Sequence, residues 1–216
     1  MLSKHFAPES REFKNLETIH TAGTHARDLV QQILAFSRKN TPSKQLADLA
    51  LLLREMIPML RAIVPATIRL ETRIEKVPPI PADAGQIHQV VMNLVVNAAQ
   101  AIGGAMGTVT IALGLEAGVP AQGRERASPR HLIHLSVRDT GCGMDEITRS
   151  RVFEPFFTTK NVGEGTGLGL AVVHGVVSEH GGRVTVESHV GMGTCFDVYL
   201  PVPSPEAMSR TPEAAA

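Results

Sequence analysis

The chain has 216 residues, a formal net charge of zero at pH 7 and a sequence pI near 7.1. This balance of charge argues against binding to nucleic acid or to an acidic membrane surface. No apolar run is long enough to cross a membrane, and residues 1–10 lack the apolar core of a signal peptide, so we expect a cytoplasmic protein.

Aromatic residues make up only 4% of the chain and tryptophan is absent, so the core is expected to be aliphatic. Of the two cysteines, Cys142 lies between two glycines and Cys195 lies two residues after Gly193. We expect both to be reduced and buried, because a cytoplasmic protein rarely keeps a disulfide and nothing near them suggests a metal site.

Residues 9–39 are predicted to form one long helix, which ends at Thr41 and Pro42. Apolar and small residues recur in it at alternating steps of three and four, the pattern of a helix that packs against another helix. The residues of this seam are Leu16, Ile19, Gly23, Ala26, Val30, Ile33 and Ser37. One helix cannot bury such a seam alone, so we expect a partner, either a second helix or another copy of the chain.

A second helix is predicted over residues 47–64, kinked or interrupted at Pro58, followed by a strand over 67–74. The proline-rich segment 77–81 is expected to be a connector. Asp83 is a typical N-cap residue, and the apolar pattern that follows it predicts a strong helix to about residue 102.

The second half of the chain alternates strand patterns with one helix. Strands are predicted over 108–115, 132–139, 183–189 and 194–200, and a helix over 168–180. Residues 116–130 are expected to form a solvated loop, and residues 204–216 a disordered tail. Helices interspersed with antiparallel hairpins predict an α+β sandwich.

A glycine-dense stretch over residues 153–170 precedes the last helix, with alternating glycines from Gly163 to Gly169. Glycine can take backbone conformations that turn amide groups toward a ligand, and a helix N-terminus favours a bound phosphate. Lys160 supplies a positive charge for the same anion. The spacing matches neither the P-loop nor the dinucleotide fingerprint, so a plain connecting turn remains an alternative reading.

Three further motifs accompany this stretch. Asn93 and Asn97 share one face of the predicted helix, and their amide oxygens suit Mg²⁺ that also contacts phosphates. Asp139 follows a strand and precedes Gly141, Cys142, Gly143 and Met144, where a carboxylate can accept the amine of adenine; an ordinary Asp-Gly turn is the alternative. Gly191, Gly193 and Thr194 close the last hairpin.

Together and in this order, the motifs resemble the N, G1, F, G2 and G3 boxes of the catalytic domain of sensor histidine kinases, in the GHKL superfamily. The resemblance covers residues 42–203 and implies a two-layer α/β sandwich with a mixed sheet, here preceded by one long N-terminal helix. Residues 29–39 resemble the second helix of the kinases' dimerisation and phosphotransfer domain. We therefore predict that residues 1–41 are a remnant of that helical hairpin.

The resemblance also implies roles for single residues. Asn97 resembles the family's Mg²⁺-binding asparagine, Asn93 a phosphate-supporting residue and Asp139 the adenine-binding aspartate. The other positions that match the family's ATP-binding motifs are Gly141, Gly143, Met144, Phe153, Lys160, Gly165, Thr166, Gly167, Leu168, Gly169 and Thr194. The implied partners are a response regulator receiver domain, the acceptor helix of the intact kinase and a second copy bound through the N-terminal helix.

The chain also departs from the family pattern. No early histidine, among His5, His20 and His25, is followed by an acidic residue as the phosphoaccepting histidine is. The chain therefore looks truncated, and autophosphorylation by it alone is not expected. Related ATPases carry a glutamate where this chain has Asn93, which cannot take a proton, so slow hydrolysis is expected. A GHKL ATPase or protein kinase acting on a partner, and a non-catalytic adaptor, remain alternatives.

Overall fold

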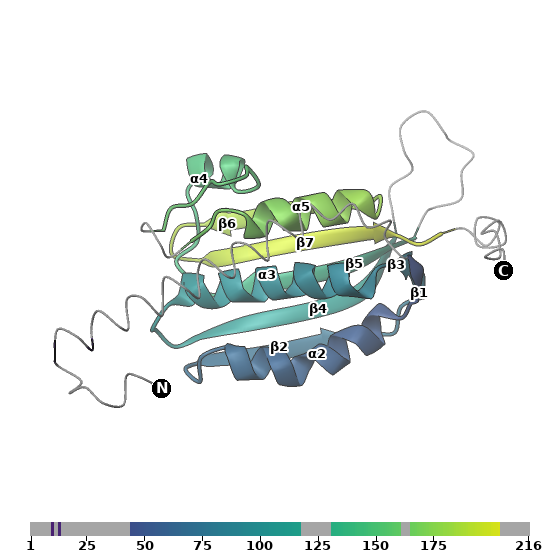
Figure 1. The fold of residues 1–216 in the computed structure, drawn as a ribbon, viewed down its shortest axis with the longest axis horizontal. Helices are drawn as coiled ribbons and strands as arrows, with labels where there is room; N and C mark the ends of the chain where they lie inside the picture. Colours follow the sequence, from purple (N-terminus) through teal and green to yellow (C-terminus); the bar gives the residue numbers. More distant parts are fainter. Residues whose placement is uncertain (1–9, 11–12, 14–43, 118–130, 161–164, 204–216) are drawn as a thin grey trace.

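The structure is a computed structural model of the chain, and it describes residues 10, 13, 44–117, 131–160 and 165–203 (Figure 1). The predicted long N-terminal helix, most of the loop over 116–130 and the predicted tail lie outside the described residues. The domain that contains the predicted motifs is described almost throughout.

A five-stranded sheet forms one layer of the domain, with strand order β2-β4-β5-β7-β6. The strands are β2 Ile68–Ile74, β4 Gly107–Ala117, β5 His131–Asp139, β6 Arg183–His189 and β7 Gly193–Pro201. The pair β2 and β4 is parallel, and the other neighbours are antiparallel. The predicted α+β class with a mixed sheet is thereby confirmed.

Helices cover one face of this sheet (Figure 1). They are α2 Leu49–Ile63, α3 Ala84–Ile102 and α5 Gly169–Glu179. Between the two layers lies an aliphatic core, because inward residues of the strands alternate with outward ones. Its largest fully buried side chains are Leu49, Leu53, Met56, Leu60, Leu94, Ile111, Leu113, Ile133, Leu135, Leu200, Val90 and Val91.

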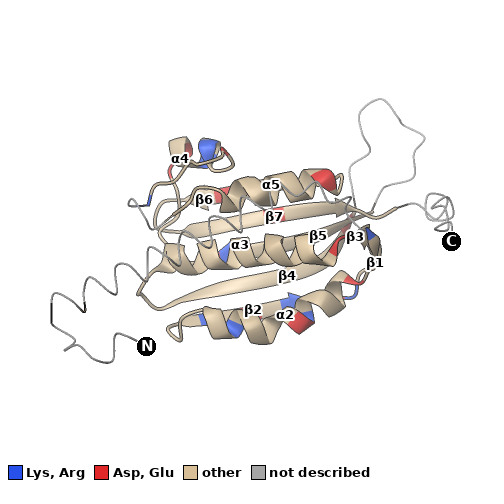
Figure 2. Ribbon diagram, viewed as in Figure 1, with Lys and Arg blue, Asp and Glu red and all other residues tan. Residues whose placement is uncertain are grey.

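The central helix α3 begins where the sequence predicted, since the side chain of Asp83 accepts a hydrogen bond from the backbone N–H of Gln86 at 3.1 Å. It carries no Asp, Glu, Lys or Arg, whereas α2 and the short helix α4 (Glu146–Arg151) display charged residues (Figure 2). An uncharged central helix fits its place between α2 and α5. None of the described helices combines the length and the apolar character needed to cross a bilayer.

Three local features differ from the sequence-based expectation. The proline-rich segment is not only a connector, because β3 (Ile80–Ala82) pairs with β1 (Gln45–Ala47) in a two-stranded ribbon. Proline is tolerated there because such a ribbon has open edges. Pro58 lies inside α2 and does not interrupt it, so of the two expected outcomes only a kink remains; the proline removes one helical hydrogen bond. The six-residue helix α4 was not predicted.

His180 joins the end of α5 to the start of α3. Its ring is 8% exposed, its Nδ1 lies 2.8 Å from the carbonyl oxygen of Val176, and its Nε2 accepts the backbone N–H of Asp83 at 3.2 Å. Since Nε2 accepts, Nδ1 carries the proton. This contact orients α5 relative to α3, and these two helices carry most of the predicted site.

The cysteines differ from each other. Cys195 is buried as expected, and its burial, with the nearby carboxylate of Asp197, raises the pKa of its thiol to about 11. Cys142 is exposed, contrary to the expectation, because it lies in the loop after β5 rather than in a strand. Neither cysteine forms a disulfide.

Candidate functional site

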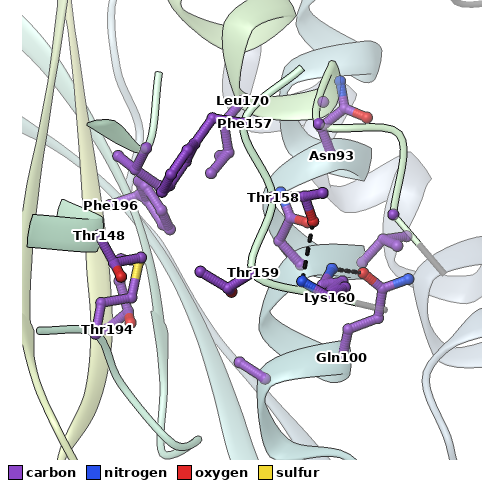
Figure 3. A pocket seen from close by; sticks show the side chains of 18 of the residues that line it. Asn93, Gln100, Thr148, Phe157, Thr158, Thr159, Lys160, Leu170, Thr194 and Phe196 are labelled. Atoms are coloured by element: carbon purple, nitrogen blue, oxygen red, sulfur yellow. Dashed lines mark hydrogen bonds between the residues drawn. The ribbon is translucent and has the colours of Figure 1, made fainter. Parts of the chain in front are cut away.

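A pocket of about 600 Å³ opens between α3, the start of α5, α4 and the end of the sheet. Figure 3 shows Asn93, Gln100 and Lys160 on one side of it and Thr148, Thr194 and Phe196 on the other. The structure brings most of the predicted site residues to its surface. These are Asn93, Asn97, Asp139, Gly143, Met144, Lys160, Gly165, Thr166, Gly167, Gly169 and Thr194.

Three predicted site residues lie behind that surface. A Cβ on Gly141 would be 2.6 Å from the carbonyl carbon of Ala101, so this glycine lets the loop after β5 pack directly on α3. Leu168 is 8% exposed and precedes the first residue of α5. Phe153 packs edge-on against Phe196, with ring centres 6.2 Å apart. All three therefore shape the pocket wall from behind.

One end of the pocket has features that favour an anion. Helix α5 begins at Gly169, and its N-cap residue Leu168 has an apolar side chain that makes no capping hydrogen bond to the first amide groups. A Cβ on Gly169 would lie 3.6 Å from Asn93 Oδ1 and 3.8 Å from Asn97 Nδ2, so the helix start lies against both amides. Lys160 borders the same region, and its ammonium group donates a hydrogen bond to the side chain of Gln100 (Figure 3). Free helical amides and an ammonium group together favour a phosphate.

A divalent cation would find only part of its ligands here. Within the described ranges, no group of three or more His, Cys, Asp or Glu side chains is placed to hold a metal ion. Asn93 and Asn97 offer neutral amide oxygens, which suit Mg²⁺ that keeps several waters and takes its remaining ligands from phosphates. The two asparagines therefore fit Mg²⁺ that arrives with a phosphorylated ligand.

The opposite end of the pocket holds the buried carboxylate of Asp139, which is 4% exposed. Its Oδ1 accepts the backbone N–H groups of Gly141 at 2.8 Å and Thr194 at 3.3 Å. Burial raises the pKa of this carboxyl group above its ordinary value, and the two hydrogen bonds oppose that rise. A carboxylate in this setting accepts a hydrogen bond from a ligand's amine group.

Sequence reasoning missed several residues of the site. Gln100 lies seven residues after Asn93, and this spacing places both on one helix face, so the pattern could have revealed it. Ser188 is buried in β6 and hydrogen-bonds to Met144 and Thr194, but no motif marks it. The other missed residues of the pocket wall are Val96, Ala101, Cys142, Thr148, Val152, Thr158, Thr159, Leu170 and Phe196.

Residues 82–204 match the family model described as "Histidine kinase-, DNA gyrase B-, and HSP90-like ATPase". This chain belongs to that ATPase family. Within this family, its sequence is similar to sensor histidine kinases. It is 36% identical over 207 residues to the sensor kinase CckA of Brucella abortus, and the matched residues make up 93% of this chain and 21% of CckA. The chain thus spans about a fifth of the length of that relative.

Solved structures of the ATPase family show the same fold. The catalytic domain of histidine kinase ThkA is 28% identical, with a TM-score of 0.56 over 73% of this chain and 95% of that domain. Full-length ShkA, solved in complex with AMPPNP, is 25% identical, with a TM-score of 0.67 over 94% of this chain and 42% of ShkA. These likenesses confirm the expected ATP-binding catalytic domain of the sensor histidine kinase type.

Proposed function

We propose that this chain is the catalytic core of a two-component sensor histidine kinase, which transfers the γ-phosphoryl group of ATP to a histidine on an acceptor helix. One observation carries the proposal. The start of α5, whose N-cap residue makes no side-chain hydrogen bond, lies against Asn93 and Asn97 at one end of the pocket, while the carboxylate of Asp139 lies at the other end. A nucleotide with a polyphosphate at one end and an amine-bearing base at the other matches this arrangement.

Each part of the pocket has a task in that reaction. Asp139 holds the base, the first amides of α5 and the ammonium group of Lys160 hold the phosphates, and Asn97 with Asn93 orients the metal-bound phosphates. Bound Mg²⁺ supplies neutralisation of the phosphate charge. An imidazole nitrogen then attacks the γ-phosphorus, a nitrogen–phosphorus bond forms, the bond to the bridging oxygen breaks, and ADP leaves.

Transfer to histidine is favoured over hydrolysis because no described residue at the phosphate end of the pocket is a base that could activate water. Among the described residues that line the pocket, Asp139 is the only carboxylate, and it lies at the base end. Asn93 occupies the place one helical turn before Asn97 and cannot take a proton. An ATPase that acts on a protein partner is the second candidate function.

The test has two steps. Calorimetry of the chain with MgATP should show saturable binding at micromolar to millimolar ligand, and a lack of heat would favour a non-catalytic adaptor. The chain is then incubated with γ-labelled ATP and a dimerisation domain that carries an acceptor histidine. Acid-labile, base-stable label on that domain is the expected result. Acid-stable label, or rapid phosphate release without an acceptor, would contradict the proposal.

Mg²⁺ alone is expected not to bind, because the asparagine pair lacks the charge to hold it without phosphates. Calorimetric titration of the nucleotide-free chain with MgCl₂ should give only heat of dilution, and the same titration with ADP present should saturate. The variant Asn97→Ala should keep its thermal midpoint and lose the second signal. Saturable Mg²⁺ binding without nucleotide would contradict this assignment.

The partners follow from the proposed function. A response regulator receiver domain would take the phosphoryl group from the acceptor histidine, and a second copy of the chain would pack against the predicted seam over residues 9–39. The reaction would take place in the cytoplasm, where ATP is available. Light scattering of the chain checks the dimer, for which a strictly monomeric mass would be the contrary result.

A further inference from the structure

Ser188 lies beside the base end of the pocket, near the end of β6, and it is 5% exposed. Its hydroxyl oxygen lies 2.8 Å from the backbone nitrogen of Met144, 3.1 Å from the carbonyl oxygen of Gly193 and 2.9 Å from the hydroxyl oxygen of Thr194. A single buried hydroxyl therefore contacts the loop after β5, the hairpin turn and a residue of the pocket wall.

The positions of the protons follow from counting. A hydroxyl group has one proton to donate and two lone pairs that accept. The carbonyl oxygen of Gly193 can only accept, so it takes the proton of Ser188, and the backbone N–H of Met144 fills one lone pair. The contact with Thr194 must then use the other lone pair, so the hydroxyl group of Thr194 donates its proton to Ser188.

Five backbone donors near this end are also engaged within the protein. Backbone N–H groups around the loop donate to the carboxylate of Asp139, to the hydroxyl of Ser188 or to main-chain carbonyl groups at 2.8–3.3 Å. These N–H groups belong to Thr140, Gly141, Cys142, Met144 and Thr194. Within this network, the carboxylate of Asp139 and the hydroxyl oxygen of Thr194 line the pocket, and both are left to accept a hydrogen bond from a ligand.

We infer that Ser188 is a positioning residue that sets base selectivity, because it holds the proton of Thr194 away from the pocket and leaves an edge made of acceptors. This inference rests on the proposed function, in which a nucleotide base occupies this end. The 6-amino group of adenine donates to such an edge. The 6-oxo group of guanine would face the two acceptors of Asp139 and Thr194, which is an unfavourable contact.

The variant Ser188→Ala removes the acceptor for the Thr194 proton, so that this proton can turn toward the pocket and meet a carbonyl group. The ratio of interest is the dissociation constant of MgGDP divided by that of MgADP. Calorimetry with both nucleotides should show this ratio falling about five- to tenfold, which is the size of one hydrogen bond. Ser188→Thr keeps the hydroxyl group and should restore the ratio. Ser136→Ala is the matched control. Ser136 lies in β5, three residues before Asp139 and therefore on the other face of the sheet, so this variant should leave the ratio unchanged.

A second variant removes the hydroxyl group of Thr194 itself, on the other side of the contact. Thr194→Val keeps the shape and the backbone N–H but lacks the hydroxyl group, so it should also lower the ratio. Adding Ser188→Ala to Thr194→Val should change the ratio no further, because Ser188 acts through Thr194. This comparison does not depend on the stability of any single variant.

The outcomes separate the two levels of the argument. Equal weakening of ADP and GDP binding in Ser188→Ala, with the ratio unchanged, would overturn the role of Ser188 and leave the proposed function intact. If the unchanged chain binds neither nucleotide, the proposed function is overturned, and the inference with it. The expected result is that Ser188→Ala lowers the ratio in the unchanged chain and does not lower it further in the Thr194→Val background.

Discussion

Asp139→Asn should abolish most nucleotide binding while leaving the domain folded. The variant keeps an oxygen that can accept the N–H groups of Gly141 and Thr194, but it places an NH₂ group where the ligand amine is to be bound. Loss of a hydrogen bond to a charged group costs about 1.5–3 kcal/mol, or roughly ten- to 150-fold in Kd. Calorimetry with MgATP measures the loss, and circular dichroism measures the thermal midpoint.

The stability of this variant provides the control. Burial raises the pKa of Asp139 in the folded state, so the proton is held more tightly there than in the unfolded chain. The corresponding contribution to stability is present below the unfolded pKa and is lost as the pH rises through the folded pKa. At pH 7, Asp139→Asn should therefore be at least as stable as the unchanged chain, and the difference should vanish in acid.

Nucleotide affinity should depend on pH in the opposite direction to stability, and it should fall as the pH falls. As the pH falls through the raised pKa, the carboxylate of Asp139 takes up a proton and no longer accepts an amine on both oxygens, so affinity for ADP declines. The decline should begin above the ordinary titration range of an aspartate. Asp139→Asn should show no such dependence. A collapsed thermal midpoint in this variant would mean that Asp139 is a structural residue, and the assignment to the base would fail.

Gly167→Ala should weaken nucleotide binding by about tenfold or more, on the scale of 1–2 kcal/mol for a left-handed non-glycine residue. Gly167 has a φ of +65°, and a Cβ there would lie 2.4 Å from the carbonyl carbon of Phe156. The carbonyl of Gly167 also accepts the N–H of Phe156 at 2.9 Å, so the wall of the pocket must shift. Because this segment lies outside the aliphatic core, the thermal midpoint should change little.

Gly175→Ala is the matched control for this substitution. Gly175 lies within α5, and a Cβ there meets nothing within 4 Å. Alanine should stabilise the helix by about 0.5–1 kcal/mol and leave nucleotide binding unchanged. Calorimetry and thermal unfolding of both variants make the comparison. Unfolding of Gly167→Ala would show that the glycine supports the fold rather than the pocket.

Much of the fold follows from patterns that are local in the chain. The alternation of Ile133, Leu135 and Val137 predicts a strand with one buried face, and Asp83 predicts the start of α3. The spacing of Asn93 and Asn97 places both on one helix face, whatever the helix packs against. Such features depend on contacts within one or two turns or strands, so the sequence alone is enough to predict them.

Contacts between distant segments could not be predicted in this way. Nothing in the local pattern says that the ribbon strand β3 pairs with β1, or that Lys160 reaches Gln100 sixty residues earlier. Ser188 reads as an ordinary serine in a strand, yet it meets Met144 through the way that the loop after β5 lies against the hairpin turn. The exposure of Cys142 has the same origin.

The amino-acid sequence by itself determined the helices, the strands, the glycine turns and the family to which the chain belongs, because each is written in residues that are close together in the chain. Tertiary structure alone decided which protons and lone pairs face the pocket. The loop after β5 and the hairpin between β6 and β7 come together only when the strands take their register, and that register commits the hydroxyl groups of Ser188 and Thr194 to each other.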